Sequence, residues 1–466
     1  MSDTGVRIFN TLTKRKEPLE VGPDGVVRIY VCGPTVYSRI HIGNARPFVV
    51  FSVLRRYLSR RGGLRARLVS NLTDVNDKIY DAARREGRPS AEVAERYGRA
   101  YKEDTDRLGL GRPDDEPTVT ETMPRIVELI AALVDRGLAY PAGGDVYYRV
   151  DRFDGYGKLS GRRLDEMVPT DPGEAKEHPL DFALWKGRKP DEDTWWDSPW
   201  GPGRPGWHIE CSAMAEALLG VDFEIHGGGI DLVFPHHENE IAQTEGARCA
   251  PLAKIWMHNE MLELGGEKMA KSVGNIEPLA DVLDRWPAEV VIAFFLTSHY
   301  RSKLPFTEER MLQAKEWCDK LRNAIRALDR AIAAPGDGQD PQLAATLVDA
   351  RARFFAALDD DFNTPEAFGV LADLIRATNG AVEGDRPGAD QLREARHMLV
   401  DLLDVLGLAS LDQPEEIPAE VLDLARARDA ARAARDFARS DSLRDEIRTR
   451  GFEVRDTPEG TQVYTA

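Results

Sequence analysis

A short polar motif near the N-terminus carries side chains suited to binding a phosphate. His41-Ile42-Gly43-Asn44 follows a run typical of a buried strand and opens a run typical of a helix. A helix N-terminus offers free N–H groups and a partial positive charge, which favours anions. His41 and Asn44 are three residues apart, so both can face one side and donate hydrogen bonds. The alternative is structural, with Asn44 capping the helix and His41 in the preceding loop.

A second motif places two cations close together far along the chain. Lys268 and Lys271 are three residues apart, and Gly274 and Asn275 follow them. Two ammonium groups in a glycine-flanked loop could neutralise a polyphosphate while it is attacked. The alternative is a solvated loop that happens to carry two lysines.

A third group of residues has the chemistry of metal ligands. Cys32 ends the first strand, Cys211 follows Trp207-His208-Ile209-Glu210, and His236 and Glu240 are four apart at the start of a predicted helix. Two thiolates, an imidazole and a carboxylate form a plausible tetrahedral zinc set. The four span 208 residues and match no compact zinc module, so buried core thiols and a capped acidic helix remain the alternative. The other two cysteines, Cys249 and Cys318, have no such neighbours and are expected to be structural.

A glycine-rich segment, His226 to Asp231, follows a predicted strand. It includes Gly228, and its three consecutive glycines permit close approach of a nucleotide or sugar to the backbone. A tight turn with an incidental Asp231 is the alternative.

These motifs need elements that bring them together. Residues 27–36 read as a buried strand, 43–61 as a helix with an apolar stripe, and 65–72 as a second strand. Strand, helix and strand in about 45 residues form a βαβ unit, which predicts a parallel sheet. A second α/β segment is expected from about 205 to 300, with strands at 223–226 and 253–258.

The rest of the chain divides into an insertion and a helical part. Residues 77–138 look helical, and 140–200 are rich in Gly, Pro and Trp and indicate an insertion with some β structure. From 308 onward the chain is mostly helical, with Asn363 marking one helix start. We therefore expect a Rossmann-type catalytic domain at 1–300 with an insertion at about 115–204, and a helical bundle at 301–411.

The last segment, 419–466, is distinct and predicts a small α+β domain. Residues 421–450 hold eight arginines, six acids and no lysine. Two helices are expected to meet near Ser440, which can cap the second, and 452–456 and 461–465 alternate like a hairpin. Five arginines at near-helical spacing could form one basic face, with internal ion pairs as the alternative: Arg426, Arg428, Arg432, Arg435 and Arg439.

Composition limits the class of protein. The 466 residues carry 62 Lys+Arg against 79 Asp+Glu, a formal net charge of −17, with 42% hydrophobic residues. This composition argues against a mainly disordered chain and against a wholly basic surface for gripping nucleic acid. The first fifteen residues contain no apolar run of signal-peptide length, so the cytoplasm is the expected compartment.

Taken together, the motifs resemble those of the cysteinyl-tRNA synthetase family of class I aminoacyl-tRNA synthetases. The resemblance covers essentially the whole chain, in the family's order. It rests on residues 30–37, 41–44, 71–78, 205–214, 226–231, 234–240 and 268–272. Two positions depart from the commonest signatures, with Asn44 in place of His and Ala270 in place of Ser.

The resemblance implies a role for each motif. Zinc would be held by Cys32, Cys211, His236 and Glu240, would select cysteine by its thiolate, and would make an editing domain unnecessary. ATP, accompanied by magnesium, would lie by His41, Asn44, Gly228, Asp231, Lys268 and Lys271. Further substrate contacts would come from Cys32, Gly33, Thr35, Thr73, Trp207 and His226. The implied partner is tRNA, read by an anticodon-binding domain at 419–466, and the implied state is a monomer.

Two other functions remain open from the sequence. A cysteine ligase of mycothiol synthesis would share the zinc and ATP chemistry but transfer cysteine to an amino sugar, and such ligases lack the last domain. A non-catalytic tRNA-binding paralogue should have lost a zinc ligand or a signature lysine, and none is lost here.

Overall fold

The structure is a computed structural model of the chain. It describes residues 2–169, 175–264, 267–268, 276–384, 387–413, 417–457 and 460–465. The chain forms two compact units, Met1–Ala409 and Ser410–Ala466. Among the described residues, no helix is both long enough and apolar enough to cross a membrane.

A four-stranded parallel sheet forms the centre of the first unit. Its order is β10 (Ala253–Asn259), β9 (Phe223–Gly229), β3 (Val26–Val31) and β4 (Arg65–Ser70). The predicted βαβ unit and parallel sheet are confirmed, although β3 and β4 end earlier than the apolar pattern indicated. In β3 the residues at 29 and 30 have no exposed surface, as expected for a strand covered on both faces.

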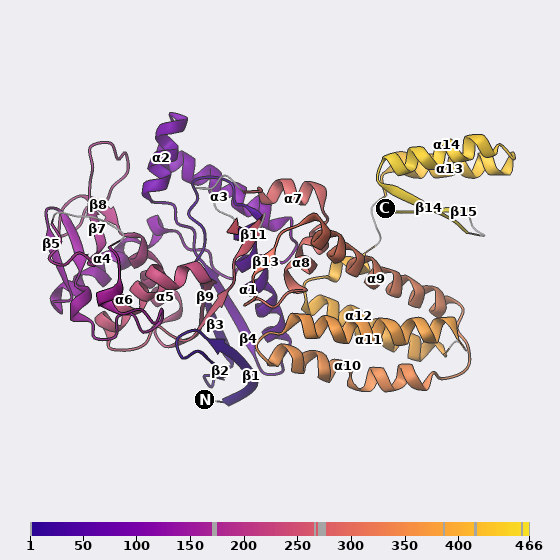
Figure 1. The fold of residues 1–466 in the computed structure, drawn as a ribbon, viewed down its shortest axis with the longest axis horizontal. Helices are drawn as coiled ribbons and strands as arrows, with labels where there is room; N and C mark the ends of the chain where they lie inside the picture. The colour runs from indigo at the N-terminus through magenta and orange to yellow at the C-terminus, as the bar shows by residue number, and fades with distance from the viewer. Residues whose placement is uncertain are drawn as a thin grey trace. The chain divides into compact units, whose positions relative to one another are not determined.

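Helix α1 (Ile42–Arg60) joins β3 to β4. Its predicted apolar stripe is buried, and Pro47 lies in the second turn, close to the helix start. The C-terminal half of α1 is tied to the helices that follow later in the chain, since Arg56 Nη2 lies 2.7 Å from Asp404 Oδ1. One helix therefore runs from the edge of the sheet to the bundle (Figure 1).

The predicted insertion contains an antiparallel sheet of order β5 (Ala139–Ala142), β6 (Asp145–Tyr148), β7 (Phe182–Gly187) and β8 (Gly203–Pro205). It is preceded by α2 (Asp77–Glu86), α3 (Ser90–Asp106) and α4 (Val119–Asp135), and interrupted by the short turns η1 (Val150–Arg152) and η2 (Leu164–Glu166). Helices α5 (Trp207–Leu219) and α6 (Glu238–Arg248) return to the central sheet, on either side of the turns η3 (Ile230–Leu232) and η4 (Val233–His237).

A single apolar core joins the insertion to the central sheet. It includes Tyr30 in β3, Cys32 directly after β3, Trp185 in β7 and Cys211 in α5, and all four are at most 8% exposed. Because both candidate thiol ligands belong to this core, packing of the insertion helps to fix their positions.

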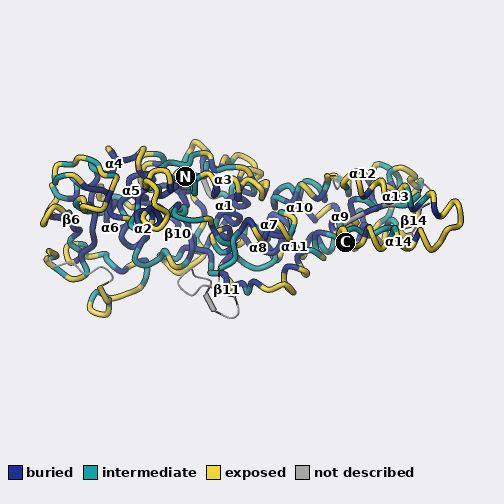
Figure 2. Tube along the Cα trace, turned by 90° about the horizontal axis from the view of Figure 1, so that it is seen from above, coloured by how far each residue is buried: buried dark blue, intermediate teal, exposed yellow. Residues whose placement is uncertain are grey.

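Smaller strands flank the sheet. β1 (Ser2–Asn10) and β2 (Arg15–Val21) form a hairpin, and β12 (Glu267–Lys268), β11 (Leu262–Leu264) and β13 (Leu304–Pro305) form a three-stranded sheet in that order. Helices α7 (Leu279–Arg285) and α8 (Ala288–Leu296) lie between β12 and β13 in the chain. Residues 290–296 of α8 are all buried, so this apolar run is an interior helix (Figure 2).

Four long helices complete the first unit and form the part of the chain that the sequence predicted to be helical (Figure 1). They are α9 (Glu308–Ala333), α10 (Pro341–Asp359), α11 (Thr364–Glu383) and α12 (Ala389–Val405), followed by the turn η6 (Ala409–Asp412). Asn363 caps α11 by accepting a hydrogen bond from the Glu366 amide, which confirms the predicted helix start.

The second unit contains α13 (Ala419–Ala433), α14 (Phe437–Thr449), β14 (Phe452–Thr457) and β15 (Gly460–Thr465). The prediction that Ser440 caps α14 is wrong. Asp436 caps it, and Ser440 is a buried residue one turn further on. A serine and an aspartate are equally good caps, so the choice depends on where the connecting turn ends.

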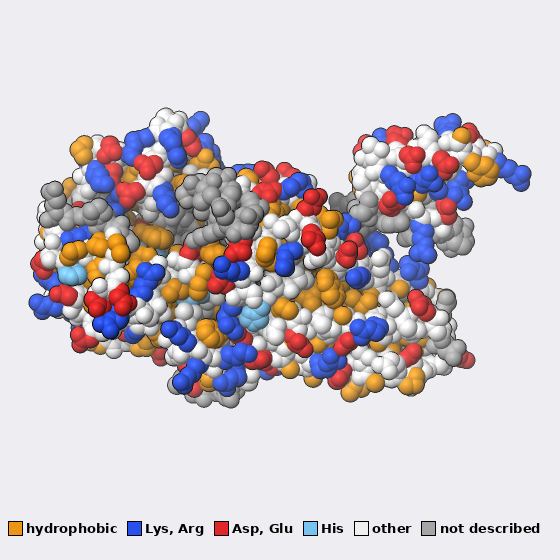
Figure 3. Space-filling model, viewed as in Figure 1, with side chains coloured by type: hydrophobic (Ala, Val, Ile, Leu, Met, Phe, Trp, Pro, Cys, Tyr) orange, Lys and Arg blue, Asp and Glu red, His pale blue; other side chains and the backbone are white. Residues whose placement is uncertain are grey.

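The arginines of this unit serve two different purposes. Arg428 is buried and paired with Asp456, which also pairs with Arg432. Arg435 and Arg439 are exposed and, among the described residues, form no ion pair. Part of the predicted basic face is therefore exposed, at Arg435 and Arg439, and part is internal, at Arg428. Figure 3 shows Lys and Arg side chains on the visible face of this unit.

Candidate active site and metal centre

Four donor side chains meet below the carboxyl ends of β3 and β9. Cys32 directly follows β3, Cys211 lies in the second turn of α5, His236 is in η4 and Glu240 is in α6. One donor atom from each lies within 4.8 Å of the others, and all four residues are buried. The structure therefore brings together the four metal-ligating residues that the resemblance implied.

The protonation states of these groups suit a metal. Burial raises the pKa of the Cys32 and Cys211 thiols, so both hold their protons at neutral pH until a cation displaces them. Burial lowers the pKa of His236 to about 3, so its imidazole is neutral at pH 7 and can offer a lone pair. Two sulfurs, one nitrogen and one oxygen match the donors that zinc prefers.

One donor atom of this set also lacks a hydrogen-bond partner. Glu240 Oε2 is buried without a hydrogen bond, and the nearest imidazole nitrogen, His226 Nε2, is 3.3 Å away. Glu240 Oε1 lies 3.1 Å from His236 Nε2 and 3.3 Å from Cys32 Sγ. A buried carboxylate is costly without a compensating charge, and a bound cation supplies one. The residues present therefore fit a zinc ion.

A second donor set overlaps the first. Cys32 and Glu240 are shared, while His226 and His237 replace Cys211 and His236. The two sets differ in their surroundings. His236 stacks on Trp207, whose ring is 4.3 Å away and 38% exposed, whereas His226 is packed between the rings of Tyr30 and Trp256. The first set therefore faces the side from which a small molecule can enter.

Other predicted substrate contacts form the walls around Cys32. The Gly33 amide donates to Asn71 Oδ1 at 2.8 Å, and a Cβ at Gly33 would lie 1.7 Å from the Asn71 carbonyl oxygen. Thr35 and Thr73 face each other in a parallel bridge. Thr73 Oγ1 donates to Glu210 Oε2 at 3.2 Å, and burial raises the pKa of Glu210 well above its usual range.

The start of α1 forms the second part of the site. His41 is the N-cap, its Nδ1 accepts from the Gly43 amide at 3.1 Å, and Asn44 Oδ1 accepts from the His41 amide at 3.3 Å. The two side chains therefore cap the helix reciprocally, as in a capping box. They also line a cavity of about 170 Å³ whose other lining residues include Cys32, Gly33, Gly229, Asp231, Asn259, Glu260 and Met261. His41 and Asn44 therefore cap the helix and also lie where they can contact a ligand in the cavity.

The glycine-rich end of β9 is explained largely by packing. A Cβ at Gly227 would meet the Phe51 ring of α1 at 2.2 Å, and a Cβ at Gly228 would meet Leu232 at 2.9 Å and His237 at 3.1 Å. Gly229 and Asp231 line the cavity at the start of α1, and Gly228 is not among its lining residues. The three glycines let β9 pass close to α1 and η4.

The second phosphate motif is described only at its edge. Lys268 lies in β12, its side chain is outside the described residues, and Lys271 lies outside them altogether. The described flanks of this segment are attached to α1. The Ile42 amide donates to the Glu277 carbonyl at 2.9 Å, and the Leu279 amide donates to the Ile40 carbonyl at 3.0 Å.

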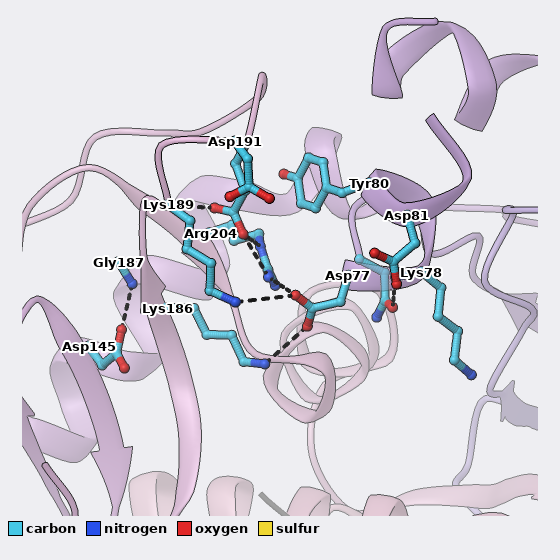
Figure 4. A network of polar contacts seen from close by, with 12 residues as sticks. Asp77, Lys78, Tyr80, Asp81, Asp145, Lys186, Gly187, Lys189, Asp191 and Arg204 are labelled. Atoms are coloured by element: carbon cyan, nitrogen blue, oxygen red, sulfur yellow. Dashed lines mark hydrogen bonds and ion pairs between the residues drawn. The ribbon is translucent and has the colours of Figure 1, made fainter. Parts of the chain in front are cut away.

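A buried ionic network supports the segment that leads into α5 (Figure 4). Arg204 in β8 donates through Nε and Nη2 to Glu192 Oε1, each at 3.0 Å, and both side chains are 3% exposed. Arg204 also pairs with Asp77 at the start of α2, and Lys186 Nζ lies 3.1 Å from Asp77 Oδ2. The network fixes β8 two residues before Trp207, so it orients the helix that carries Cys211.

Sequence reasoning missed three supporting residues. Asn71 binds Gly33, His208 Nδ1 lies 3.0 Å from His236 Nδ1, and Arg46 is fully buried beside the cavity. His208 orients the candidate metal ligand as outer-shell partners do. Only Arg46 had a local signal, since it is a charged residue within an otherwise apolar helix face.

Three families match successive parts of the chain. The tRNA synthetases class I (C) catalytic domain matches residues 18–316, the DALR domain matches 353–410, and the cysteinyl-tRNA ligase anticodon binding domain matches 415–463. Among solved structures, the Mycobacterium tuberculosis methionyl-tRNA synthetase in complex with methionyl-adenylate is similar in fold, with a TM-score of 0.60. It is 16% identical, and the match covers 86% of this chain and 94% of that one.

The parallel sheet, the capped helix start and the matching catalytic domain define a class I aminoacyl-tRNA synthetase. Two curated relatives narrow the class. The cysteine–tRNA ligases of Brevibacillus brevis and Geobacillus thermodenitrificans are 44% and 45% identical to this chain, and each match covers 98% of the chain and 99% of the relative. The chain belongs to the cysteine–tRNA ligase family.

Proposed function

We infer that this chain attaches cysteine to tRNA in two steps. A carboxylate oxygen of cysteine attacks the α-phosphorus of ATP, and diphosphate leaves. A hydroxyl of the terminal ribose then attacks the carbonyl carbon of the adenylate, loses its proton, and AMP leaves. The observation that carries this inference is the buried set of two thiols, an imidazole and a carboxylate beside a capped helix start. Such a reaction depends on positioning and charge stabilisation more than on acid–base chemistry.

Cys32, Cys211, His236 and Glu240 are the proposed holders of one zinc ion per chain. When bound there, zinc would take the cysteine sulfur as a thiolate and discriminate against the hydroxyl of serine. The protein residues around it have their own tasks. Trp207 stacks on His236 and forms an exposed wall, and His208 holds the His236 ring. We assign Gly33, Thr35, Thr73 and His226 to the remaining walls of the cysteine pocket.

The start of α1 is the proposed site of the ATP phosphates. The dipole of this helix start favours a polyphosphate, and His41 and Asn44 lie at its mouth. Gly228 and Asp231 are the proposed contacts from β9 and η3. Lys268 and Lys271 are proposed to stabilise the charge that develops on the leaving diphosphate, which magnesium would accompany.

The second unit is the proposed reader of the tRNA anticodon, and the chain is proposed to act as a monomer in the cytoplasm. Support comes from its match to an anticodon-binding domain and from the exposed Arg435 and Arg439. A chain with net charge −17 needs such local basic surface to hold RNA.

One assay distinguishes the proposed function from the two alternative functions. The purified chain is incubated with ATP and cysteine and then with either tRNA or the amino sugar of mycothiol. Attachment of cysteine to tRNA is the expected result. Cysteine-dependent diphosphate exchange with transfer only to the sugar would identify a mycothiol ligase. Binding of tRNA without any exchange would identify a non-catalytic protein.

A further inference from the structure

Arg46 is the most deeply buried charged side chain near the proposed ATP site. It lies in the second turn of α1, two residues after Asn44, and has no exposed surface. Its guanidinium donates to four main-chain carbonyls. Nη1 reaches Glu260 at 2.7 Å and Met261 at 3.2 Å, and Nη2 reaches Ser302 at 2.7 Å and His299 at 3.2 Å.

The four carbonyls belong to two segments that enter one small sheet. Glu260 and Met261 lead directly into β11, and His299 and Ser302 precede β13. β11 pairs in parallel with β13 and antiparallel with β12, the strand that contains Lys268. The Arg46 side chain therefore holds the segments that lead into β11 and β13, and β11 pairs with the strand that contains Lys268.

The far flank of the same motif is attached to the same end of α1. There the contacts are purely main-chain, between Ile42 and Glu277 and between Ile40 and Leu279. Both flanks of the segment with the two lysines are thus attached within a few residues of His41 and Asn44. Arg46 is the side-chain part of this attachment, so it is the part that a substitution can remove.

Packing alone does not explain a guanidinium at this position. Among the described residues no carboxylate lies within ion-pair distance of Arg46, and its Nε has no hydrogen-bond partner. Burial lowers the pKa of Arg46 to about 10, so the group stays charged at pH 7. Burying a charge against neutral carbonyls is costly, and an apolar side chain of similar volume would fill the space but leave those four carbonyls without this donor. The forked geometry, which can bridge two strands at once, is what an apolar residue lacks.

We propose that Arg46 is a positioning residue for cysteine activation. It holds β11 and β13, and with β11 the start of the lysine motif in β12, against the first turns of α1. This inference rests on the proposed function, because it assigns the attachment of β11 and β13 to the start of α1 to the activation step. It predicts an effect on turnover rather than on cysteine binding.

The test is the variant Arg46→Lys. A single ammonium cannot bridge both strands as the guanidinium does. We expect the kcat of cysteine-dependent diphosphate exchange to fall roughly 10- to 100-fold, as for a displacement of about 1 Å at a reacting centre. The KM for cysteine and the zinc content should stay within twofold of the wild type. Hydrogen exchange should accelerate in β11 and β13 but not in β10.

The matched control is Arg56→Lys on the same helix. Arg56 also donates to a main-chain carbonyl and to a side chain, both of Asp404, about 15 Å further along α1. This control should lose stability without the selective fall in kcat. Unchanged kcat in Arg46→Lys, or equal losses in both variants, would overturn the proposal.

Two further measurements distinguish a failure of the Arg46 proposal from a failure of folding or of the proposed function. If Arg46→Lys does not fold, Arg46→Gln retains a donor without burying a charge, and the same selective fall in kcat is required of it. If the wild type shows no exchange, the proposed function fails. The exchange rates of β11 and β13 in Arg46→Gln then still report whether Arg46 holds these strands, and unchanged rates would refute that role.

Discussion

The buried pair of Arg204 and Glu192 allows a quantitative prediction about the insertion. Both side chains are 3% exposed, and two nitrogens of Arg204 lie 3.0 Å from one oxygen of Glu192. Replacing Arg204 by Met removes the cation but roughly preserves the volume. Glu192 is then a buried carboxylate whose remaining described contact is the Lys189 amide at 3.1 Å.

The magnitude follows from burial. Removing one partner of a buried ion pair costs about 3 to 5 kcal/mol because the other charge is left uncompensated. The second partner of Arg204, Asp77, is 47% exposed, so losing that pair adds at most about 1 kcal/mol. We therefore expect Arg204→Met to lower the free energy of unfolding of the first unit by roughly 3 to 5 kcal/mol. The double variant Arg204→Met with Glu192→Leu should recover most of this loss.

Intrinsic fluorescence in urea is a suitable assay, because five of the eight tryptophans lie between 185 and 207: Trp185, Trp195, Trp196, Trp200 and Trp207. The single variant should also show a raised KM for cysteine, since β8 leads directly into α5. A loss below about 1 kcal/mol in Arg204→Met, or a double variant no more stable than the single one, would refute the reasoning.

Cys211→Ser should lose bound zinc and cysteine activation together, measured as metal content and diphosphate exchange; full activity without zinc would contradict the ligand assignment. Gly33→Ala should destabilise the first unit by roughly 1 to 3 kcal/mol, because its Cβ would collide with the neighbouring backbone; an unchanged urea midpoint would show that the strands can part. Burial acts to raise the pKa of Asp77, but the neighbouring cations outweigh this effect and leave the pKa lowered. The ionised Asp77 therefore stabilises the fold above the unfolded pKa of about 3.9. This stabilisation is lost as the pH falls through the folded pKa. The stability difference between wild type and Asp77→Asn should therefore be present at pH 7 and shrink below about pH 4, and a difference that grows on acidification would reverse the assignment. Arg428→Ala should destabilise the second unit, whereas Arg439→Ala should weaken tRNA binding at unchanged stability, and the opposite pattern would exchange their roles.

The local parts of the fold could be predicted because their signals are local. The apolar stripe of α1 and the β-branched runs of β3 and β4 lie within about 45 residues, and their period specifies helix and strand directly. The cap at Asn363 is also a local signal. The cap at Ser440 failed because it depends on a turn whose length the side-chain pattern does not encode.

The candidate metal centre was not derivable from spacing. Cys32 and Cys211 become neighbours only because β3 pairs with β9 and α5 packs against that sheet, although the whole insertion separates them in the chain. The family resemblance implied the ligand set, whereas the residues alone favoured a pair of buried core thiols. The second donor set, with His226 and His237, was invisible in the sequence for the same reason.

The surroundings of the β9 glycines and of Arg428 could not be predicted from residue type. The glycines of β9 left a ligand site and a tight turn open, and the atoms that a Cβ would meet belong to Phe51 at Gly227, to Leu232 and His237 at Gly228, and to Asp231 at Gly229. Close packing accounts for these glycines, and the ligand contact of Gly228 stays a prediction. Arg428 looked like a member of a basic face and is instead an internal residue. Neither outcome follows from residue type, because both depend on which segment packs opposite.

The separation of the metal donors along the chain has a consequence for biosynthesis. During translation the thiol at position 32 is made long before the carboxylate at position 240, and the thiol at position 211 follows only shortly before that carboxylate. A nascent chain therefore passes through lengths at which it has reactive sulfurs but no complete cage for a cation. Binding of the proposed zinc ion would then be a late event, after the last of the four donors has joined the folded sheet.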